Sequence, residues 1–211
     1  MAQYLVVHPD NPQRRLLRAT AAIVHAGGVI AYPTDSGYAL GCALANTEGR
    51  ERIRRLRALD DHHPFTLVCR DLSEIATYAR VDNATYRILR AHTPGPYTFV
   101  LPASREVPRR LLDPKRRTIG LRVPDHRITQ ALLSELGAPL MSVTLALPGE
   151  EEPLCDPAEI RQRLEHQVDA VVDGGGCIAA PTTVVEWDGQ DFRIRRSGTG
   201  DPSVFAPGPP G

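Results

Sequence analysis

The sequence lacks the features that mark membrane and secreted proteins. No apolar run approaches the roughly 20 residues that a helix needs to cross a bilayer. The first residues, Met1 to Tyr4, contain neither the basic region nor the apolar stretch of a signal peptide. We therefore expect no membrane partner and a protein that stays in the cytoplasm, where it is made.

Cysteine is also scarce, and it occurs at Cys42, Cys69, Cys155 and Cys177. No two of these residues form a CxxC pair, and no histidine stands beside one at a spacing typical of zinc ligands. The pattern predicts four reduced thiols, with no protein-bound structural metal and no disulfide framework.

Lysine and aromatic side chains are scarce, whereas arginine is abundant. Of the 25 Lys and Arg residues, Lys115 is the one lysine, and aromatic residues make up 5% of the chain. The planar guanidinium of arginine suits bidentate contacts to phosphate. Although the formal net charge is zero, arginines crowd residues 50–57 and 109–127, so we expect an anionic ligand there.

These two basic segments supply the candidates for RNA binding, which are Arg54, Arg55, Arg109, Arg110, Arg116 and Arg117. No aromatic side chain is interleaved with them, which disfavours stacking of single-stranded bases. Contacts to the phosphate backbone of an RNA duplex need no aromatics. The composition is thus compatible with double-stranded RNA or tRNA as a partner.

The length and the hydrophobic fraction of 42% are sufficient for one buried core. We expect a single domain over residues 1–205 and a flexible tail at 206–211. Periodicity and capping signals predict helices at 13–26, 47–59, 83–92, 127–136 and 156–166, and one more that opens at Asp71. Apolar runs predict strands at 29–32, 38–43, 65–69, 97–101, 118–123, 140–147 and 168–172, and a hairpin from 183–187 and 192–195.

This alternation of strands and helices predicts an α/β fold: an open twisted sheet of mixed parallel and antiparallel strands with helices on its faces. Pro33 is expected to end the first of the predicted strands. In such sheets ligands bind at the ends of strands, where the loops gather. We therefore expect a basic concave cleft at those loops.

The loop after the first predicted strand has the sequence YPTDSGY, from Tyr32 to Tyr38. Its hydroxyls and backbone amides can bind a small polar ligand. The same residue types also make an ordinary turn between two strands. Spacing alone favours that second interpretation.

Five segments in the same order carry a family resemblance: GVIAYPTDSGY at 28–38, PGPYT at 94–98, LRVP at 121–124, PTTVV at 181–185 and RSG at 196–198. Together they resemble the YrdC/YciO family of threonylcarbamoyl-AMP synthase-like proteins, over about residues 13–200. The segments at 8–12, 32–41 and 65–73 are most similar to the YciO branch.

The resemblance implies a YrdC-like fold and an enzyme that makes threonylcarbamoyl-AMP and diphosphate from L-threonine, bicarbonate and ATP. That product would feed the threonylcarbamoyl adenosine modification of tRNA, and Mg²⁺ would accompany the ATP phosphates. By position, Thr34, Arg122 and Thr182 would bind threonine, with the guanidinium of Arg122 on its carboxylate.

The resemblance also implies a phosphate-binding side of the site. Arg57, Thr144 and Arg196 would bind the nucleotide phosphates. Thr34 and Arg122 would join Arg57 and Thr144 as the catalytic set, which would act by positioning and charge neutralisation.

Two departures from the family pattern fall on that phosphate side. The family enzymes carry a Lys-x-Arg pair where this chain has Arg57 and Leu59, and a Ser-x-Asn motif where it has Thr144 and Ala146. Losing a cation and an amide near a charged transition state would cost on the order of a thousandfold in rate.

Three functions therefore stay open at this point. The first is the synthase, which would need compensation from Arg54, Arg55 or His63. The second is a YciO-type protein that binds double-stranded RNA without strong synthase activity. The third is hydrolysis of threonylcarbamoyl-AMP or another acyl-adenylate. The sequence leaves open the oligomeric state and any general base, Asp35 included.

Three other features favour ordinary structural roles. His62 and His63 are adjacent, and adjacent residues rarely converge on one metal ion, so a solvated loop is expected. The segment DGGG at 173–176 lacks the Lys-Ser/Thr of a P-loop and predicts a flexible turn. Trp187 at a strand end is expected in the core or at the sheet edge.

Overall fold

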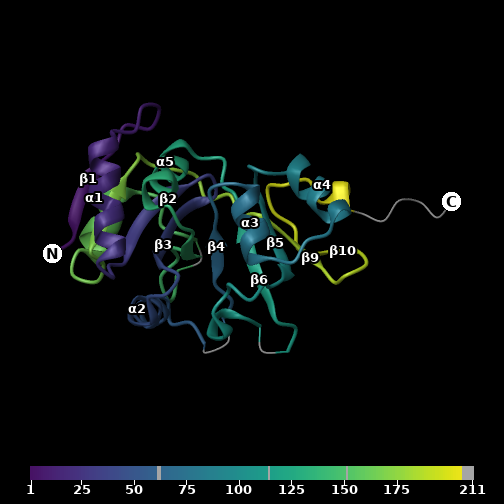
Figure 1. Cartoon of the computed structure of the whole chain (residues 1–211). Coiled ribbons are helices and arrows are strands. Elements are labelled where there is room, and N and C mark those ends of the chain that lie inside the picture. The colour runs from purple at the N-terminus through teal and green to yellow at the C-terminus, as the bar shows by residue number, and fades with distance from the viewer. Residues whose placement is uncertain (61–62, 114, 151, 206–211) are drawn as a thin grey trace.

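The computed structural model describes residues 1–60, 63–113, 115–150 and 152–205. Their strands form a ten-stranded sheet in the order β1-β8-β2-β3-β7-β4-β6-β5-β9-β10 (Figure 1). The strands are β1 (Gln3–Val6), β2 (Ile30–Thr34), β3 (Gly37–Ala43), β4 (Thr66–Val68), β5 (Tyr97–Pro102), β6 (Thr118–Arg122), β7 (Leu140–Thr144), β8 (Ala170–Asp173), β9 (Thr183–Trp187) and β10 (Phe192–Arg196). Parallel and antiparallel pairs both occur, so the predicted mixed sheet is confirmed.

Six α-helices cover this sheet within the described residues: α1 (Arg14–His25), α2 (Thr47–Arg57), α3 (Leu72–Tyr78), α4 (Asn83–Ala91), α5 (Arg127–Leu136) and α6 (Pro157–Leu164). The predicted caps are present. Asn46 accepts a hydrogen bond from the backbone N–H of Gly49, and Asp156 caps α6. No described helix is long and apolar enough to cross a membrane.

The strand β2 is buried on both faces, and its side chains alternate between two hydrophobic clusters. Ile30 and Tyr32 belong to the cluster that contains the apolar side chains of α1 and α5. Ala31 belongs to the other cluster, which contains Ile53 of α2. Figure 1 shows α1 and α5 side by side and α2 on the opposite side of the sheet.

The sheet must curl strongly, because a short segment joins strands that lie far apart in it. Residues 174–182, which we call the strap, have no regular secondary structure and connect β8 to β9. Six strands separate β8 from β9 in the sheet order. In a flat sheet that separation would be about 34 Å, and a fully extended chain from Asp173 to Thr183 would span about 33 to 36 Å. The strap is not fully extended, because Gly175 has a positive φ and lies in a hydrogen-bonded turn, so the sheet must be curved.

Several predicted boundaries need correction. Pro33 does not end the strand: β2 runs through Pro33 to Thr34, and Pro33 pairs with Tyr38 of β3. The strand tolerates proline because β8, its other neighbour, pairs only with Ile30 and Ala31. β1 was not predicted, and β7 ends at Thr144 rather than 147. The predicted tail at 206–211 lies outside the described residues.

Candidate functional site

The turn between β2 and β3 is held together by the hydroxyl of Thr34. This hydroxyl donates to the carbonyl of Gly37 at 2.7 Å and accepts from the backbone N–H of Ser36 at 3.1 Å. It also lies 3.1 Å from the hydroxyl of Ser36. Thr34 is 4% exposed. The turn is thus rigid and presents the Ser36 hydroxyl beside that of Thr34.

Arg122, the last residue of β6, reaches this turn from across the sheet. Its Nη1 donates to the Ser36 hydroxyl at 2.7 Å, and its Nη2 forms an ion pair with Asp35. The other carboxylate oxygen of Asp35 accepts from the backbone N–H of Asp125 at 3.2 Å. Three strands separate β2 from β6 in the sheet order, so this contact again reflects the curl of the sheet.

The guanidinium of Arg122 is nearly buried, with 9% of its side chain exposed, and Asp35 has 14% exposed. The Nε atom of Arg122 is buried and has no hydrogen-bond partner among the described residues. An unsatisfied charged donor in such a place costs free energy. The Nε–H group of Arg122 can therefore donate a hydrogen bond to an acceptor oxygen of a ligand.

His126, the N-cap residue of α5, lies close to this ion pair. Burial lowers the pKa of His126, while the negative charges of Asp35 and Asp125 oppose that shift and the charge of Arg122 reinforces it. Nδ1 of His126 faces the N–H of Thr129 at 3.4 Å. Both observations favour the neutral imidazole.

The strap passes directly over the turn. The backbone N–H of Ala180 donates to the carbonyl of Ser36 at 3.4 Å. At the start of the strap, the hydroxyl of Tyr38 donates to the carbonyl of Gly175 and accepts from the N–H of Gly174. Asp173 also accepts from the N–H of Gly175. The turn predicted at 173–176 is therefore anchored by at least three hydrogen bonds.

Thr182 ends the strap and brings Arg196 into the same region. The Thr182 hydroxyl lies 2.8 Å from that of Thr98, and Thr182 is 4% exposed. Nη2 of Arg196 donates to the carbonyl of Thr182 at 3.0 Å. The strap thus connects the Thr34–Arg122 side of the site to the pair of Thr182 and Arg196.

Thr144 lies at the end of β7, opposite Ala39 of β3. Its side chain is exposed. The next residue, Leu145, donates from its N–H to the carbonyl of Tyr38. β4 begins opposite Ser142 of β7, so the loop before β4, which carries His63, lies at the same edge of the sheet as Thr144.

Arg57 ends α2 and has a buried Nε without a hydrogen-bond partner among the described residues. Desolvation lowers the pKa of the Arg57 guanidinium. Desolvation also lowers the pKa of His63; Asp60 opposes that shift, and the charges of Arg57 and Arg54 add to it. The structure therefore places Arg54, Arg57 and His63 near one another. Compensation for the altered Lys-x-Arg motif at Arg57 and Leu59 would require this proximity.

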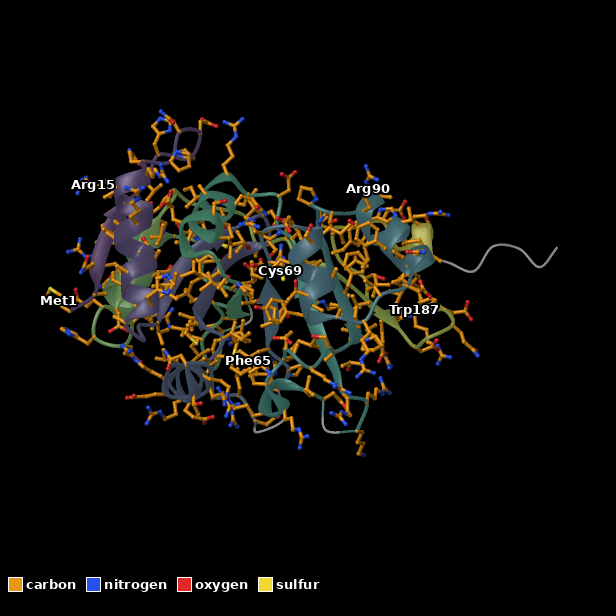
Figure 2. The ribbon with its side chains drawn as sticks, in the orientation of Figure 1. Met1, Arg15, Phe65, Cys69, Arg90 and Trp187 are labelled. Carbon is orange, nitrogen blue, oxygen red and sulfur yellow. The ribbon has the colours of Figure 1, made fainter. Side chains whose placement is uncertain are left out.

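The two basic segments meet in space. Nη1 of Arg50 donates to the carbonyl of Arg110, and Nη2 of Arg110 donates to the carbonyl of Ala45. Figure 2 shows nitrogen-tipped side chains around α2 on this side of the molecule. The spatial convergence of these arginines agrees with the sequence analysis.

The candidate RNA-binding arginines differ in whether their guanidinium groups form ion pairs within the protein. Arg54 forms an ion pair with Glu51, and Arg116 binds both carboxylate oxygens of the buried Glu186. Arg55, Arg109, Arg110 and Arg117 are exposed and make no ion pair within the described ranges. Their charges are therefore available for an external anion, although Arg110 also donates to the carbonyl of Ala45.

The structure bears on the predicted thiols and on part of the predicted histidine loop. Among the residues that the structure describes, no group of three or more His, Cys, Asp and Glu could hold a metal ion. His62 and Asp61 lie outside those residues, so the predicted loop is only partly visible. The four cysteines are free thiols, as predicted. Trp187 is half-buried and packs its ring 4.8 Å from that of Phe192 (Figure 2).

Sequence reasoning found Thr34 and Arg122 but missed two of their partners. Asp35 was considered only as a possible base, and Ser36 only as part of a turn. Both hold the guanidinium of Arg122. Asp35 and Ser36 follow β2, which three strands separate from β6 in the sheet order. Their contact with Arg122 depends on the curl of the sheet, which no local sequence signal reports.

Known proteins are similar to this chain over most of its length. Residues 22–198 match the family model Sua5_yciO_yrdC, described as "Telomere recombination". The chain is 52% identical over 205 residues to the Escherichia coli (strain K12) protein called "Uncharacterized protein YciO", covering 97% of this chain and 100% of that protein. It is 34% identical over 178 residues to a Halorhodospira halophila protein named threonylcarbamoyl-AMP synthase, covering 83% and 92%.

Solved structures agree with this picture. The crystal structure of E. coli YciO matches with a TM-score of 0.93 at 52% identity, over 98% of this chain and 100% of that chain. The crystal structure of P. abyssi Sua5 complexed with L-threonine matches with a TM-score of 0.84 at 21% identity, over 92% and 57%. At that lower identity the likeness shows the fold alone.

Proposed function

The chain belongs to the Sua5/YciO/YrdC family, and on that premise we propose that it is a threonylcarbamoyl-AMP synthase-type nucleotidyltransferase. It would convert L-threonine, bicarbonate and ATP into threonylcarbamoyl-AMP, diphosphate and water, for threonylcarbamoyl adenosine in tRNA; the water leaves when the threonine amine and bicarbonate form the carbamate. Relatives that are 34% identical carry the synthase name. The Escherichia coli relative at 52% carries the name YciO without an activity, so the reaction itself is the proposal.

One observation carries the proposal: the nearly buried guanidinium of Arg122 has an unsatisfied Nε beside the Thr34–Ser36 turn. A substrate carboxylate would satisfy that donor. Thr34 and Thr182 would supply hydroxyls to the threonine, and the strap that carries Thr182 already contacts Ser36. A small amino acid with a free carboxylate fits this arrangement.

The phosphate side would rest on Arg57, Thr144 and Arg196. Arg57 is a partly desolvated cation with an unsatisfied Nε, and an anion would stabilise it. The carbamate oxygen would attack the α-phosphorus, the bond to diphosphate would break, and the nearby guanidinium groups would neutralise the charge that develops. Mg²⁺ would enter with the ATP phosphates.

The test is direct turnover. Purified protein is incubated with L-threonine, bicarbonate and Mg-ATP, and diphosphate and threonylcarbamoyl-AMP are quantified. Arg122→Ala should abolish both products, whereas Arg15→Ala, on the outer surface of α1 (Figure 2), should leave them unchanged. Equal rates for the wild type and Arg122→Ala would reject the synthase.

A second candidate, binding of double-stranded RNA, is favoured by one specific observation. The basic segments lie next to each other through Arg50 and Arg110, while Arg55 and Arg109 keep exposed charges. Titration of duplex RNA at two salt concentrations tests it. Each of Arg55→Ala and Arg109→Ala should lower the slope of log affinity against log salt by about 1, and a salt-independent affinity would exclude this function.

A further inference from the structure

Two of the four thiols lie against each other at the strap. The backbone N–H of Cys177 donates to the carbonyl of Cys155 at 3.1 Å, and Sγ of Cys177 lies 3.7 Å from the same oxygen. Standard bond lengths then keep the two Cα atoms within about 7 Å. That is close to the separation at which a disulfide forms without a large backbone movement.

The two pairs of cysteines differ in their surroundings. Cys155 and Cys177 are partly exposed, whereas Cys42 and Cys69 are 0% exposed. Figure 2 shows Cys69 in the interior of the molecule. An oxidant in solution can therefore reach the first pair and not the second.

The pair also sits at the candidate site. A Cβ added to Gly37, at the β2–β3 turn, would lie 3.9 Å from Sγ of Cys155 and 3.9 Å from Cα of Ala179 in the strap. Cys155 directly precedes Asp156, the N-cap of α6. A bond between Cys155 and Cys177 would thus fix the middle of the strap to a rigid helix start and against the turn.

We propose that Cys155 and Cys177 are a peroxide-sensitive pair whose disulfide locks the strap closed over the site. The thiol oxidation stands by itself, and its consequence for ligand binding rests on the proposed function. Thr34 and Arg122 are almost buried beneath the present arrangement, so a ligand reaches them only when a covering segment moves. The strap is anchored at Gly174 and Gly175, and Gly176 gives the residues beyond that anchor backbone freedom for the movement.

The chemistry balances with a peroxide as the oxidant. The Cys155 thiol attacks one peroxide oxygen, which gives a sulfenic acid on Cys155 and one water. The Cys177 thiol then attacks the sulfenic sulfur, which forms the S–S bond and releases a second water. Burial and the neighbouring Cys155 raise the pKa of the Cys177 thiol, which disfavours Cys177 as the thiol that attacks the peroxide first.

The first experiment is independent of any enzymatic activity. The protein is treated with hydrogen peroxide, free thiols are blocked, and its peptides are analysed by mass spectrometry without reduction. We expect a linked pair of peptides carrying Cys155 and Cys177, with Cys42 and Cys69 still blocked as free thiols. In Cys177→Ser, Cys155 should instead accumulate sulfenic acid that dimedone traps. Modification of all four cysteines at one rate, or no link between Cys155 and Cys177, would overturn the pair.

The second experiment tests the lock. Hydrogen exchange of the strap amides should slow in the oxidised protein and recover with dithiothreitol, and Cys155→Ser should show neither change. L-threonine affinity by calorimetry should fall about tenfold on oxidation, because the open state becomes less populated. Unchanged exchange in a fully disulfide-linked sample would refute the lock. Absent threonine binding in the reduced protein, together with slowed exchange, would reject the proposed function and keep the lock.

Discussion

The two sides of the candidate site are built differently. On the turn side, Thr34 and Arg122 are nearly buried and share a network with Asp35 and Ser36. On the phosphate side, Thr144 is exposed, and the chain has Leu59 and Ala146 where the family resemblance implies a cation and an amide. Under the proposed function, the turn side would be pre-organised for a small carboxylate, whereas the phosphate side would bind the nucleotide less strongly.

This contrast separates binding from chemistry. Pre-organised donors stabilise a ligand without reorganisation, so under the proposed function recognition of the amino acid would depend on the turn side. Stabilisation of the charged transition state depends on the phosphate side. A protein with a strong first side and a weak second one is expected to bind threonine better than it turns it over.

The largest expected effect is on the turn side. Arg122→Ala should abolish threonine binding and lower the free energy of unfolding by about 3 to 5 kcal/mol, because Asp35 would keep a nearly buried charge without its partner. Denaturant unfolding at pH 7 measures the stability. The double variant Arg122→Ala/Asp35→Ala should recover part of the loss. A loss below about 1 kcal/mol would place the pair among ordinary surface ion pairs.

The next effect is on the phosphate side. Leu59→Arg with Ala146→Asn should raise the synthase rate about a hundredfold, or about 2.7 kcal/mol, without changing threonine affinity. The readout is diphosphate release with saturating threonine. As a control, Ala84→Arg adds the same charge on α4, where residue 84 is exposed, and should change nothing. An unchanged rate after both restorations would show that these positions do not limit catalysis.

Local sequence signals predicted most of the fold. The caps Asn46 and Asp156 mark their helices correctly because a capping hydrogen bond spans only a few residues. β1 was not predicted because its four residues form a strand by pairing with β8, about 170 positions along the chain. The prediction for Pro33 was wrong for a related reason: β8 pairs with β2 only at Ile30 and Ala31, so no strand on that side needs the missing N–H of Pro33.

Sequence motifs predicted individual residues of the candidate site. They did not predict the contacts that depend on the curvature of the sheet. The family motifs assign Thr34, Arg122 and Thr182, and contacts link them through Ser36 and the strap. The partnership of Asp35 with Arg122 and the contact of Cys155 with Cys177 arise from segments distant in sequence. Composition and spacing carry no information on such distances.

A smaller effect on the free energy of unfolding is expected when one hydroxyl is removed on each side of the site. Ser36→Ala removes an acceptor from the buried Arg122 and should cost about 1.5 to 3 kcal/mol of stability, as for hydrogen bonds to charged groups. Thr144→Ala removes an exposed hydroxyl and should stay within about 0.5 kcal/mol. Chemical denaturation of the two variants compares them. Equal losses would contradict the difference in burial that separates the two sides.

The smallest expected effect is on the pKa values of two histidines, His63 on the phosphate side and His126 on the turn side. Desolvation lowers the pKa of both His63 and His126 in the folded chain. The folded state therefore binds fewer protons than the unfolded one, and stability falls as the pH drops below about 6.5 toward the folded pKa values. Adding diphosphate should raise the pKa of His63, because an anion near Arg57 favours the imidazolium, and should leave His126 unchanged. NMR titration of the two imidazoles measures both. A shift of His126 instead of His63 would place the anion at the turn and reverse the assignment of the two sides.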